Sequence, residues 1–212
     1  MKELFRDPRF VVLDKPPGLP VHPARAGGPS VEDVFPSLSR RKDGPWLAHR
    51  LDTDTAGCLV VALRKAALLA AQQAFAAGLA RKTYWAVLDG PVAADAGTVD
   101  APLLRVSTPK GWRIVPDPRG QPAISDWRVR GRAGGLTWIE VHPRTGRTHQ
   151  VRVHAATLGA PILGDAQYGS SARVKLHLLA RAIHLPLDPP VDAVADPPAH
   201  MRPALEQCGW RR

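Results

Sequence analysis

Two segments that alternate apolar and polar residues place the strongest constraint on the fold. They cover residues 123–131 and 136–143, and the glycine pair Gly134 and Gly135 separates them. A period of two puts the apolar side chains on one face of a strand, and a short glycine turn lets the chain return antiparallel to itself. The sequence therefore predicts a β-hairpin, and with it a sheet that is at least partly antiparallel.

Further short segments have the composition of strands or helices. Apolar runs that end near proline or glycine predict strands over residues 9–14, 58–63, 83–90 and 178–187, the last of these being the final strand. Helical patterns cover residues 64–82 and 148–159, and Ser30 with Asp33 predicts a short capped helix broken by Pro36. Because strands and helices do not alternate regularly, we expect an α+β fold with a mixed, largely antiparallel sheet flanked by helices.

The length and composition favour one domain. A chain of 212 residues with 44% apolar residues can bury its own core, and it contains only two cysteines. We expect a single domain over residues 1–212, with a proline-rich surface tail from about residue 186. No apolar run has the length of a signal peptide or a spanning helix, so we expect a cytoplasmic protein that does not enter membranes.

The formal net charge is +10, and the basic residues are spread through the chain instead of forming a tail. Such a charge suits a protein that binds nucleic acid or another anionic surface. It is equally compatible with a generally basic composition. Charge alone leaves these alternatives open.

The segment HRLDTDTAG, residues 49–57, places Asp52 and Asp54 close together. Its D-x-D-T spelling occurs in magnesium-dependent phosphotransferases that form an aspartyl phosphate, but there the first Asp ends a buried parallel strand, which PWLAHRL does not predict. The plainer alternative is a turn held by Asp54, the neighbouring threonines and Gly57. Neither alternative requires the preceding His49 and Arg50.

The segment HPRTGRTHQVRVH, residues 142–154, contains three histidines and three arginines. His149 and His154 are five residues apart, which does not fit a zinc helix, so we expect no metal here. A Thr-Gly turn at a helix start, with arginines nearby, could bind phosphates, although a solvated basic helix face is as compatible with the pattern. Tyr84, one of two tyrosines, is either a core aromatic or a ring that stacks on a base.

Together these segments resemble the RluA family of RNA pseudouridine synthases. The similar blocks lie in the family's order and run from about residue 9 to the end: VVLDKPPGLPVHP, HRLDTDTAGCLVVA, RKTYWAVLDG, GQPAISDWRV and RTGRTHQVRVHAATLGAPILGDAQYG. The resemblance implies the pseudouridine synthase fold, with an active-site cleft across the sheet. It also implies a short member without the S4-type RNA-binding module, acting as a monomer on structured RNA, either tRNA or 23S-type ribosomal RNA or both.

The resemblance also implies roles for individual residues. Asp52 would be the nucleophile, Arg147 its partner, and Tyr84 the ring that stacks on uracil, while Arg50 would fill the space of the flipped nucleotide. The family's chemistry implies no metal or organic cofactor. Further substrate-binding residues would be His49, Lys82, Thr148, His149, Gln150 and Arg152. The alternative from another class is a non-catalytic RNA-binding protein on the same scaffold.

Overall fold

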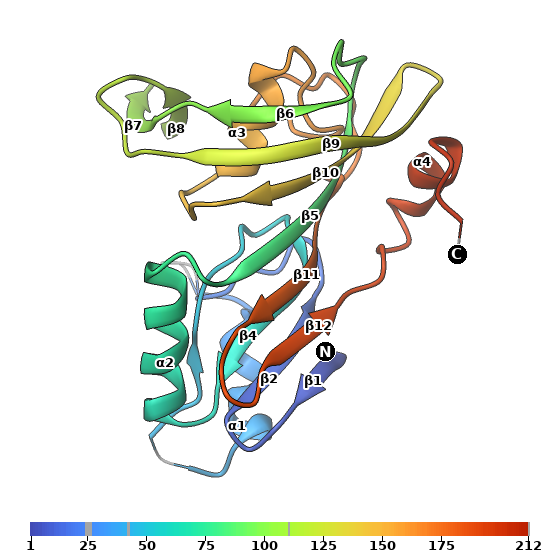
Figure 1. Ribbon diagram of the computed structural model, residues 1–212. Coiled ribbons are helices and arrows are strands. Elements are labelled where there is room, and N and C mark those ends of the chain that lie inside the picture. Colours follow the sequence, from blue (N-terminus) through green and yellow to red (C-terminus); the bar gives the residue numbers. More distant parts are fainter. Residues whose placement is uncertain (24–26, 42, 110, 212) are drawn as a thin grey trace. The chain divides into compact units, whose positions relative to one another are not determined.

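A computed structural model describes residues 1–23, 27–41, 43–109 and 111–211. The chain forms two compact units, coloured along the sequence in Figure 1: Met1–Lys82 with Leu179–Pro198, and Thr83–Leu178 with Ala199–Arg212. The chain leaves the first unit within β5 (Arg81–Leu88) and returns within β11 (Leu178–Leu185). Since each unit combines two separate stretches of sequence, no single boundary divides the chain, and the single-domain expectation stays a prediction.

The first unit is built on a mixed sheet. Its strands follow the order β1 (Glu3–Arg6), β2 (Phe10–Lys15), β4 (Ala56–Ala62) and β11, with β3 (Trp46–Leu47) paired to β4 and β12 (Val191–Val194) paired to β11. All residues of β4 are buried, as its continuous apolar sequence predicts. β4 and β11 are parallel, whereas β1, β2, β3 and β12 pair antiparallel with their neighbours.

One glycine of the HRLDTDTAG segment belongs to this sheet. Gly57 lies in β4 opposite Ala180 of β11, has a φ of +105°, and leaves no room for a Cβ atom beside the Ala180 carbonyl. Only glycine adopts this backbone conformation without strain. The expectation that Gly57 serves a turn is therefore wrong, because it permits the close approach of two strands.

The helices of the first unit are shorter than their patterns suggested. Ser30 forms the predicted capping box with Asp33, but a 3-10 helix (Val31–Val34) runs directly into α1 (Phe35–Leu38). Pro36 lies in the first turn of α1, where its missing N–H has no partner to lose, so it starts this helix instead of breaking it. α2 (Lys65–Ala76) lies beside β4 and ends before Gly78, which has a φ of +70°.

The second unit contains an antiparallel sheet in the order β5, β10 (Leu136–Pro143), β9 (Ile124–Ala133) and β6 (Ala96–Asp100). The predicted hairpin is confirmed: β9 and β10 are joined through Gly134 and Gly135, both with positive φ. α3 (Gln150–Thr157) packs Val151 and Ala155 into the apolar cluster that covers one face of this sheet. This helix confirms the pattern predicted over residues 148–159.

Several elements beyond residue 95 were not predicted, β6 among them. β7 (Leu103–Thr108) and β8 (Gly111–Pro116) form a separate two-stranded sheet, and β12 follows β11, so 178–187 is not the final strand. The proline-rich segment contains β12 and α4 (Arg202–Gln207) and buries Val191, Met201 and Leu205. It therefore contributes to the cores, although its composition suggested a surface tail.

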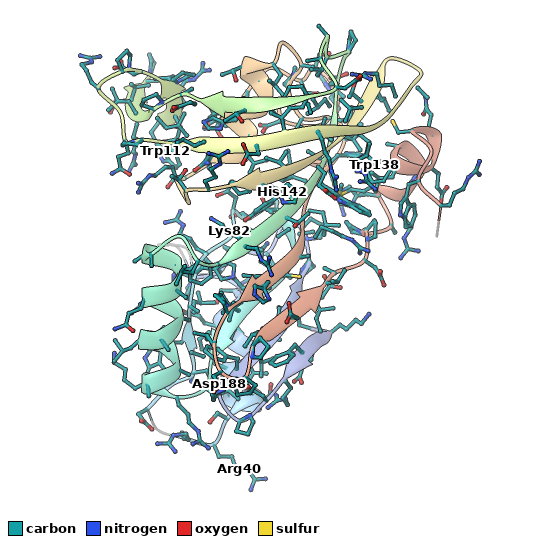
Figure 2. All side chains as sticks on the ribbon, viewed as in Figure 1. Arg40, Lys82, Trp112, Trp138, His142 and Asp188 are labelled. Atoms are coloured by element: carbon teal, nitrogen blue, oxygen red, sulfur yellow. The ribbon has the colours of Figure 1, made fainter. Side chains whose placement is uncertain are left out.

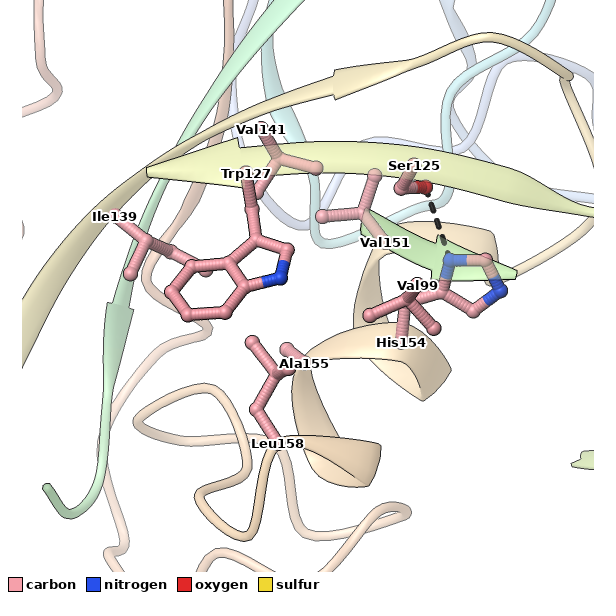
Figure 3. Close-up of a pocket in the computed structure, with 9 residues that line it drawn as sticks. All are labelled: Val99, Ser125, Trp127, Ile139, Val141, Val151, His154, Ala155 and Leu158. Carbon is pink, nitrogen blue, oxygen red and sulfur yellow. Dashed lines mark hydrogen bonds between the residues drawn. The ribbon is translucent and has the colours of Figure 1, made fainter. Parts of the chain in front are cut away.

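A small cavity lies in the core of the second unit between the sheet and α3 (Figure 3). It has about 10 Å³ of internal space, which is room for roughly one water molecule. Two of its polar lining residues, Ser125 and His154, hydrogen bond to each other at 2.9 Å. The cavity is too small for a nucleoside and is a packing feature of the core.

Within the described ranges, no helix has both the length and the apolar character needed to cross a bilayer.

Candidate active site

The loop that contains Asp52 lies in the first unit between β3 and β4. Leu51 and Thr55 are buried on either side of the half-buried Asp52, and the Thr55 N–H donates to the Asp52 carbonyl at 3.1 Å. The Gly18 N–H donates to the Thr53 carbonyl at 2.9 Å. The backbone around Asp52 is thus held by a turn of its own and by the Lys-Pro-Pro-Gly segment.

Lys15 is the main anchor of this loop. Its side chain is fully buried, and its Nζ donates to the carbonyls of Pro16 at 3.0 Å, Leu19 at 2.7 Å and Thr53 at 2.7 Å. Burial lowers the pKa of Lys15 to about 8, although the charges of Asp54 and Asp52 favour the ammonium form. We did not predict this role. The available signal was a lysine at the end of an apolar strand directly before two prolines.

His49 and Lys82 lie near one another in the first unit. The Nε2 atom of His49 accepts a hydrogen bond from the Val60 N–H at 3.0 Å, and its ring packs against Phe75 with centroids 5.1 Å apart. Burial, and after it the Lys82 charge, lowers the pKa of His49 to about 4, so the ring is neutral at physiological pH. His49 therefore supports the loop, and its contact with RNA stays a prediction. Lys82 is labelled in Figure 2.

Arg50 and Tyr84 have the exposure that their predicted roles require. Arg50 is exposed, two residues before Asp52. Tyr84 lies in β5 opposite Val141 and packs against the apolar cluster of the second unit while staying half-buried. Tyr84 thus meets the plain expectation of a core-packing aromatic, and its stacking on uracil stays a prediction.

The turn that contains Arg147 lies in the second unit between β10 and α3. It is held by the buried amide of Gln150, whose Oε1 accepts from Thr145 Oγ1 at 2.7 Å and from the Arg147 N–H at 3.0 Å. The Nε2 of Gln150 donates to the Ile124 carbonyl and to Ser125 Oγ, both at 2.9 Å. The Arg147 side chain is exposed, and its Nε donates to the Pro122 carbonyl at 3.0 Å.

His154 completes this network from the next turn of α3. Its Nε2 lies 3.2 Å from the Ala101 carbonyl and its Nδ1 lies 2.9 Å from Ser125 Oγ. Since a carbonyl only accepts, the Nε2 carries the proton and the Nδ1 accepts from the serine hydroxyl. Burial lowers the pKa of His154, which favours this neutral form. Ser125 can then also accept from Gln150, so the chain of hydrogen bonds is complete.

Two of the remaining predicted residues of the second unit, Arg152 and His149, have internal partners. Arg152 donates to both carboxylate oxygens of Asp165, at 2.7 and 2.8 Å, in a largely buried ion pair. His149 caps the start of α3 in a left-handed conformation, with a φ of +54°, and its Nδ1 lies 2.7 Å from the Tyr168 hydroxyl. Thr148 is half-buried. The Arg152 charge is therefore compensated within the protein, unlike that of an open phosphate site.

The predicted residues fall into two sets. The structure groups His49, Arg50, Asp52 and Lys82 in the first unit, and Tyr84, Arg147, Thr148, His149, Gln150 and Arg152 in the second. The pairing of Asp52 with Arg147 joins residues of both sets and stays a prediction. Among the described residues, no three His, Cys, Asp or Glu side chains are arranged to hold a metal ion.

Comparison with known proteins identifies the family. Residues 9–157 match the family model described as RNA pseudouridylate synthase. The chain belongs to the RNA pseudouridylate synthase family. An uncharacterised RNA pseudouridine synthase of Zymomonas mobilis is 44% identical over 82% of this chain and 83% of its own length. The ribosomal large subunit pseudouridine synthase D of the same organism is 36% identical over 83% of this chain and 58% of its own length.

Solved structures of pseudouridylate synthases share the fold. Human RNA pseudouridylate synthase domain containing 4 matches 99% of this chain and 94% of its own, with a TM-score of 0.82 and 28% identity. Human RNA pseudouridylate synthase domain containing 1 matches 92% and 82%, with a TM-score of 0.76 and 26% identity. These matches confirm the expected α+β pseudouridine synthase fold and the RluA-type family. Pseudouridine synthases are isomerases, which confirms the predicted enzyme class.

Proposed function

We propose that this protein isomerises uridines of structured RNA to pseudouridine, acting on tRNA, on large-subunit ribosomal RNA, or on both. The family membership supports the reaction class, and relatives named for the ribosomal large subunit support that RNA as one substrate. The net charge of +10 suits a protein that grips a polyanion. We place the enzyme in the cytoplasm.

The observation that supports the chemistry best is the loop of Asp52. Asp52 is half-buried, and the buried ammonium group of Lys15 donates to the Thr53 carbonyl next to it. This hydrogen bond holds the backbone at Asp52 in place before the substrate binds. In the proposed reaction Asp52 acts as the nucleophile while the bond between ribose C1′ and uracil N1 breaks, and the bond that its carboxylate forms breaks again before pseudouridine is released. The uracil rotates, C5 bonds to C1′, N1 takes up a proton, and the C5 hydrogen leaves as a proton.

Three other residues assist in this proposal. Arg147 pairs with Asp52 in the RNA-bound enzyme, and Tyr84 stacks on the target uracil. Arg50 enters the space that the flipped nucleotide leaves in the RNA, replacing stacking of a few kcal/mol. The exposure of Arg50 and Arg147 and the half-buried ring of Tyr84 support these roles.

The test measures tritium released from RNA labelled at uridine C5, with tRNA and large-subunit ribosomal RNA as separate substrates. We expect release by the wild-type protein and none above background by Asp52→Ala. Asp54→Ala is the matched control, because Asp54 is exposed in the same loop; it should retain activity. Equal release by Asp52→Ala and wild type would remove Asp52 from the chemistry.

Two other outcomes separate the alternatives. RNA binding without tritium release from any substrate would support a non-catalytic RNA-binding protein. Activity on a phosphate ester that EDTA abolishes would support a phosphotransferase.

The role of Arg50 is tested separately. Arg50→Ala should lower the single-turnover rate at saturating protein while the melting temperature stays unchanged. An unchanged rate would exclude the role of Arg50 in flipping.

A further inference from the structure

The hairpin of β7 and β8 presents two arginines that have no carboxylate partner among the described residues. Arg105 and Arg113 are both exposed. Three other exposed arginines of the same unit are neutralised: Arg119 by Asp117 at 2.8 Å, Arg132 by Asp95 at 2.7 Å and Arg144 by Asp126 at 2.7 Å. The hairpin therefore keeps positive charge on its surface, whereas nearby carboxylates compensate Arg119, Arg132 and Arg144.

These guanidinium groups lie on aromatic rings. The Arg105 Cζ is 4.5 Å from the centroid of Trp112, and the Arg113 Cζ is 5.9 Å from the centroid of Tyr168. Trp112, labelled in Figure 2, is itself 38% exposed although it is a large apolar side chain. Arginine planes beside an accessible indole are the groups on which proteins hold unpaired nucleotides, because they contact both phosphates and base faces.

The hairpin is attached to the turn that contains Arg147. Trp112 stacks on His149 with ring centroids 5.1 Å apart and planes inclined by 30°, and His149 follows Arg147 by two residues. The Tyr168 hydroxyl joins His149 Nδ1 at 2.7 Å to the Ile114 N–H at 3.2 Å. One ring stack and one hydroxyl thus connect the charged hairpin to the start of α3.

We propose that Arg105, Trp112 and Arg113, here called the hairpin surface, bind the RNA strand next to the target uridine. Arg105 and Arg113 contact backbone phosphates, and Trp112 contacts an unpaired base beside the target. The assignment to the neighbour of the target rests on the proposed role of Arg147. The RNA contact itself rests on the uncompensated charge and the exposed ring.

The test is equilibrium binding, by fluorescence anisotropy, of a labelled RNA stem-loop with uridines in its loop, across a series of salt concentrations. Arg105→Ala and Arg113→Ala should each weaken binding about tenfold, the loss of one charge-assisted contact. Each should also reduce the slope of log affinity against log salt by about 0.7 to 0.9. Arg119→Ala is the matched control, since its exposed guanidinium is already paired; its affinity should change by no more than about twofold.

Two further variants separate RNA binding from a purely structural role. Arg105→Lys keeps the charge and should retain the salt slope while losing part of the affinity. Trp112→Phe keeps a ring and should bind nearly as wild type, whereas Trp112→Leu should not. Unchanged affinity and salt slope in both arginine-to-alanine variants, with or without a lower melting temperature, would overturn the proposal.

The readout does not depend on isomerisation. If the protein releases no tritium but the hairpin substitutions still weaken RNA binding, the proposed function is refuted and the RNA-binding role of the hairpin surface is retained. If the enzyme is active but these substitutions do not change its affinity for RNA, only the RNA-binding role of the hairpin surface is refuted.

Discussion

The loop of Asp52 and the turn of Arg147 are each held by one buried polar side chain, but by chemically opposite means. Lys15 donates its ammonium protons to three backbone carbonyls around the Asp52 loop. Gln150 uses a neutral amide that both accepts from the Arg147 N–H and donates to strand β9. We call these two side chains the charged clamp, Lys15, and the neutral clamp, Gln150. The charged clamp is a cation that titrates, whereas the neutral clamp has no proton to gain or lose near neutral pH.

The difference matches the charge of the residue that each clamp supports. Lys15 and Asp52 carry opposite charges, and the charge of Asp52 favours the ammonium form of Lys15. At the position of Gln150, a cationic side chain would repel the Arg147 guanidinium. A carboxylate there would bind this guanidinium and compete with the RNA for it. A neutral amide fixes the turn without either effect. In each unit, one buried polar side chain thus sets both the backbone geometry and the local charge.

Replacement of the charged clamp should have the largest effect. Lys15→Met removes the donor for three carbonyls at a fully buried position, so we expect a loss of about 3 kcal/mol in the free energy of unfolding. Because the Asp52 loop loses its anchor, tritium release should fall by about a hundredfold or more. Chemical denaturation and the tritium assay, run on protein shown to be folded, measure the two effects.

Lys2→Met is the control for this substitution, because Lys2 is exposed in the same unit. It should change neither quantity. If folded Lys15→Met releases tritium at the wild-type rate, Lys15 does not position Asp52.

Replacement of the neutral clamp should have a smaller effect. Gln150→Leu breaks the hydrogen bonds to Thr145, the Arg147 N–H, Ile124 and Ser125, and we expect a loss of about 2 kcal/mol in stability. Activity should fall by about tenfold because the turn of Arg147 loosens. Gln72→Leu, an exposed position on α2, is the matched control. Wild-type activity in Gln150→Leu would show that the turn keeps its geometry without this amide.

The smallest expected effect is a pH dependence that comes from Lys15 and has no counterpart at Gln150. The folded pKa of Lys15, about 8, lies below its usual value of 10.5 because of burial. Between these values the unfolded chain holds more protons than the folded one, so the contribution of Lys15 to stability rises with pH. Activity should nevertheless fall as pH rises through about 8, because the neutral amine has two hydrogens for three carbonyls and no charge.

The measurement is single-turnover tritium release against pH, beside the melting temperature. Lys15→Met should lack the alkaline decline, whereas Gln150→Leu should keep it at a lower rate. An alkaline decline of the same shape in Lys15→Met would assign it to another group.

Much of the fold follows from local patterns in the sequence. The β9–β10 hairpin, the buried strand β4 and helix α2 were predicted because alternation, continuous apolar runs and alanine-rich periodicity act over a few residues. β12 and α4 were not predicted because they are short, lie among prolines and are stabilised by packing instead of by a local pattern. Their apolar residues, such as Met201 and Leu205, become core residues only when distant chain surrounds them.

The sequence by itself determined the β9–β10 hairpin, the strands β2, β4, β5 and β11, the principal helices, the family and the residue types of the site. Only the tertiary structure decided which polar groups hold that site in shape. Lys15 reaches a carbonyl 38 residues away, at Thr53, and Gln150 reaches one 26 residues away, at Ile124. Such partners leave no local pattern, because a buried donor is satisfied by whichever acceptor the fold brings within about 3 Å.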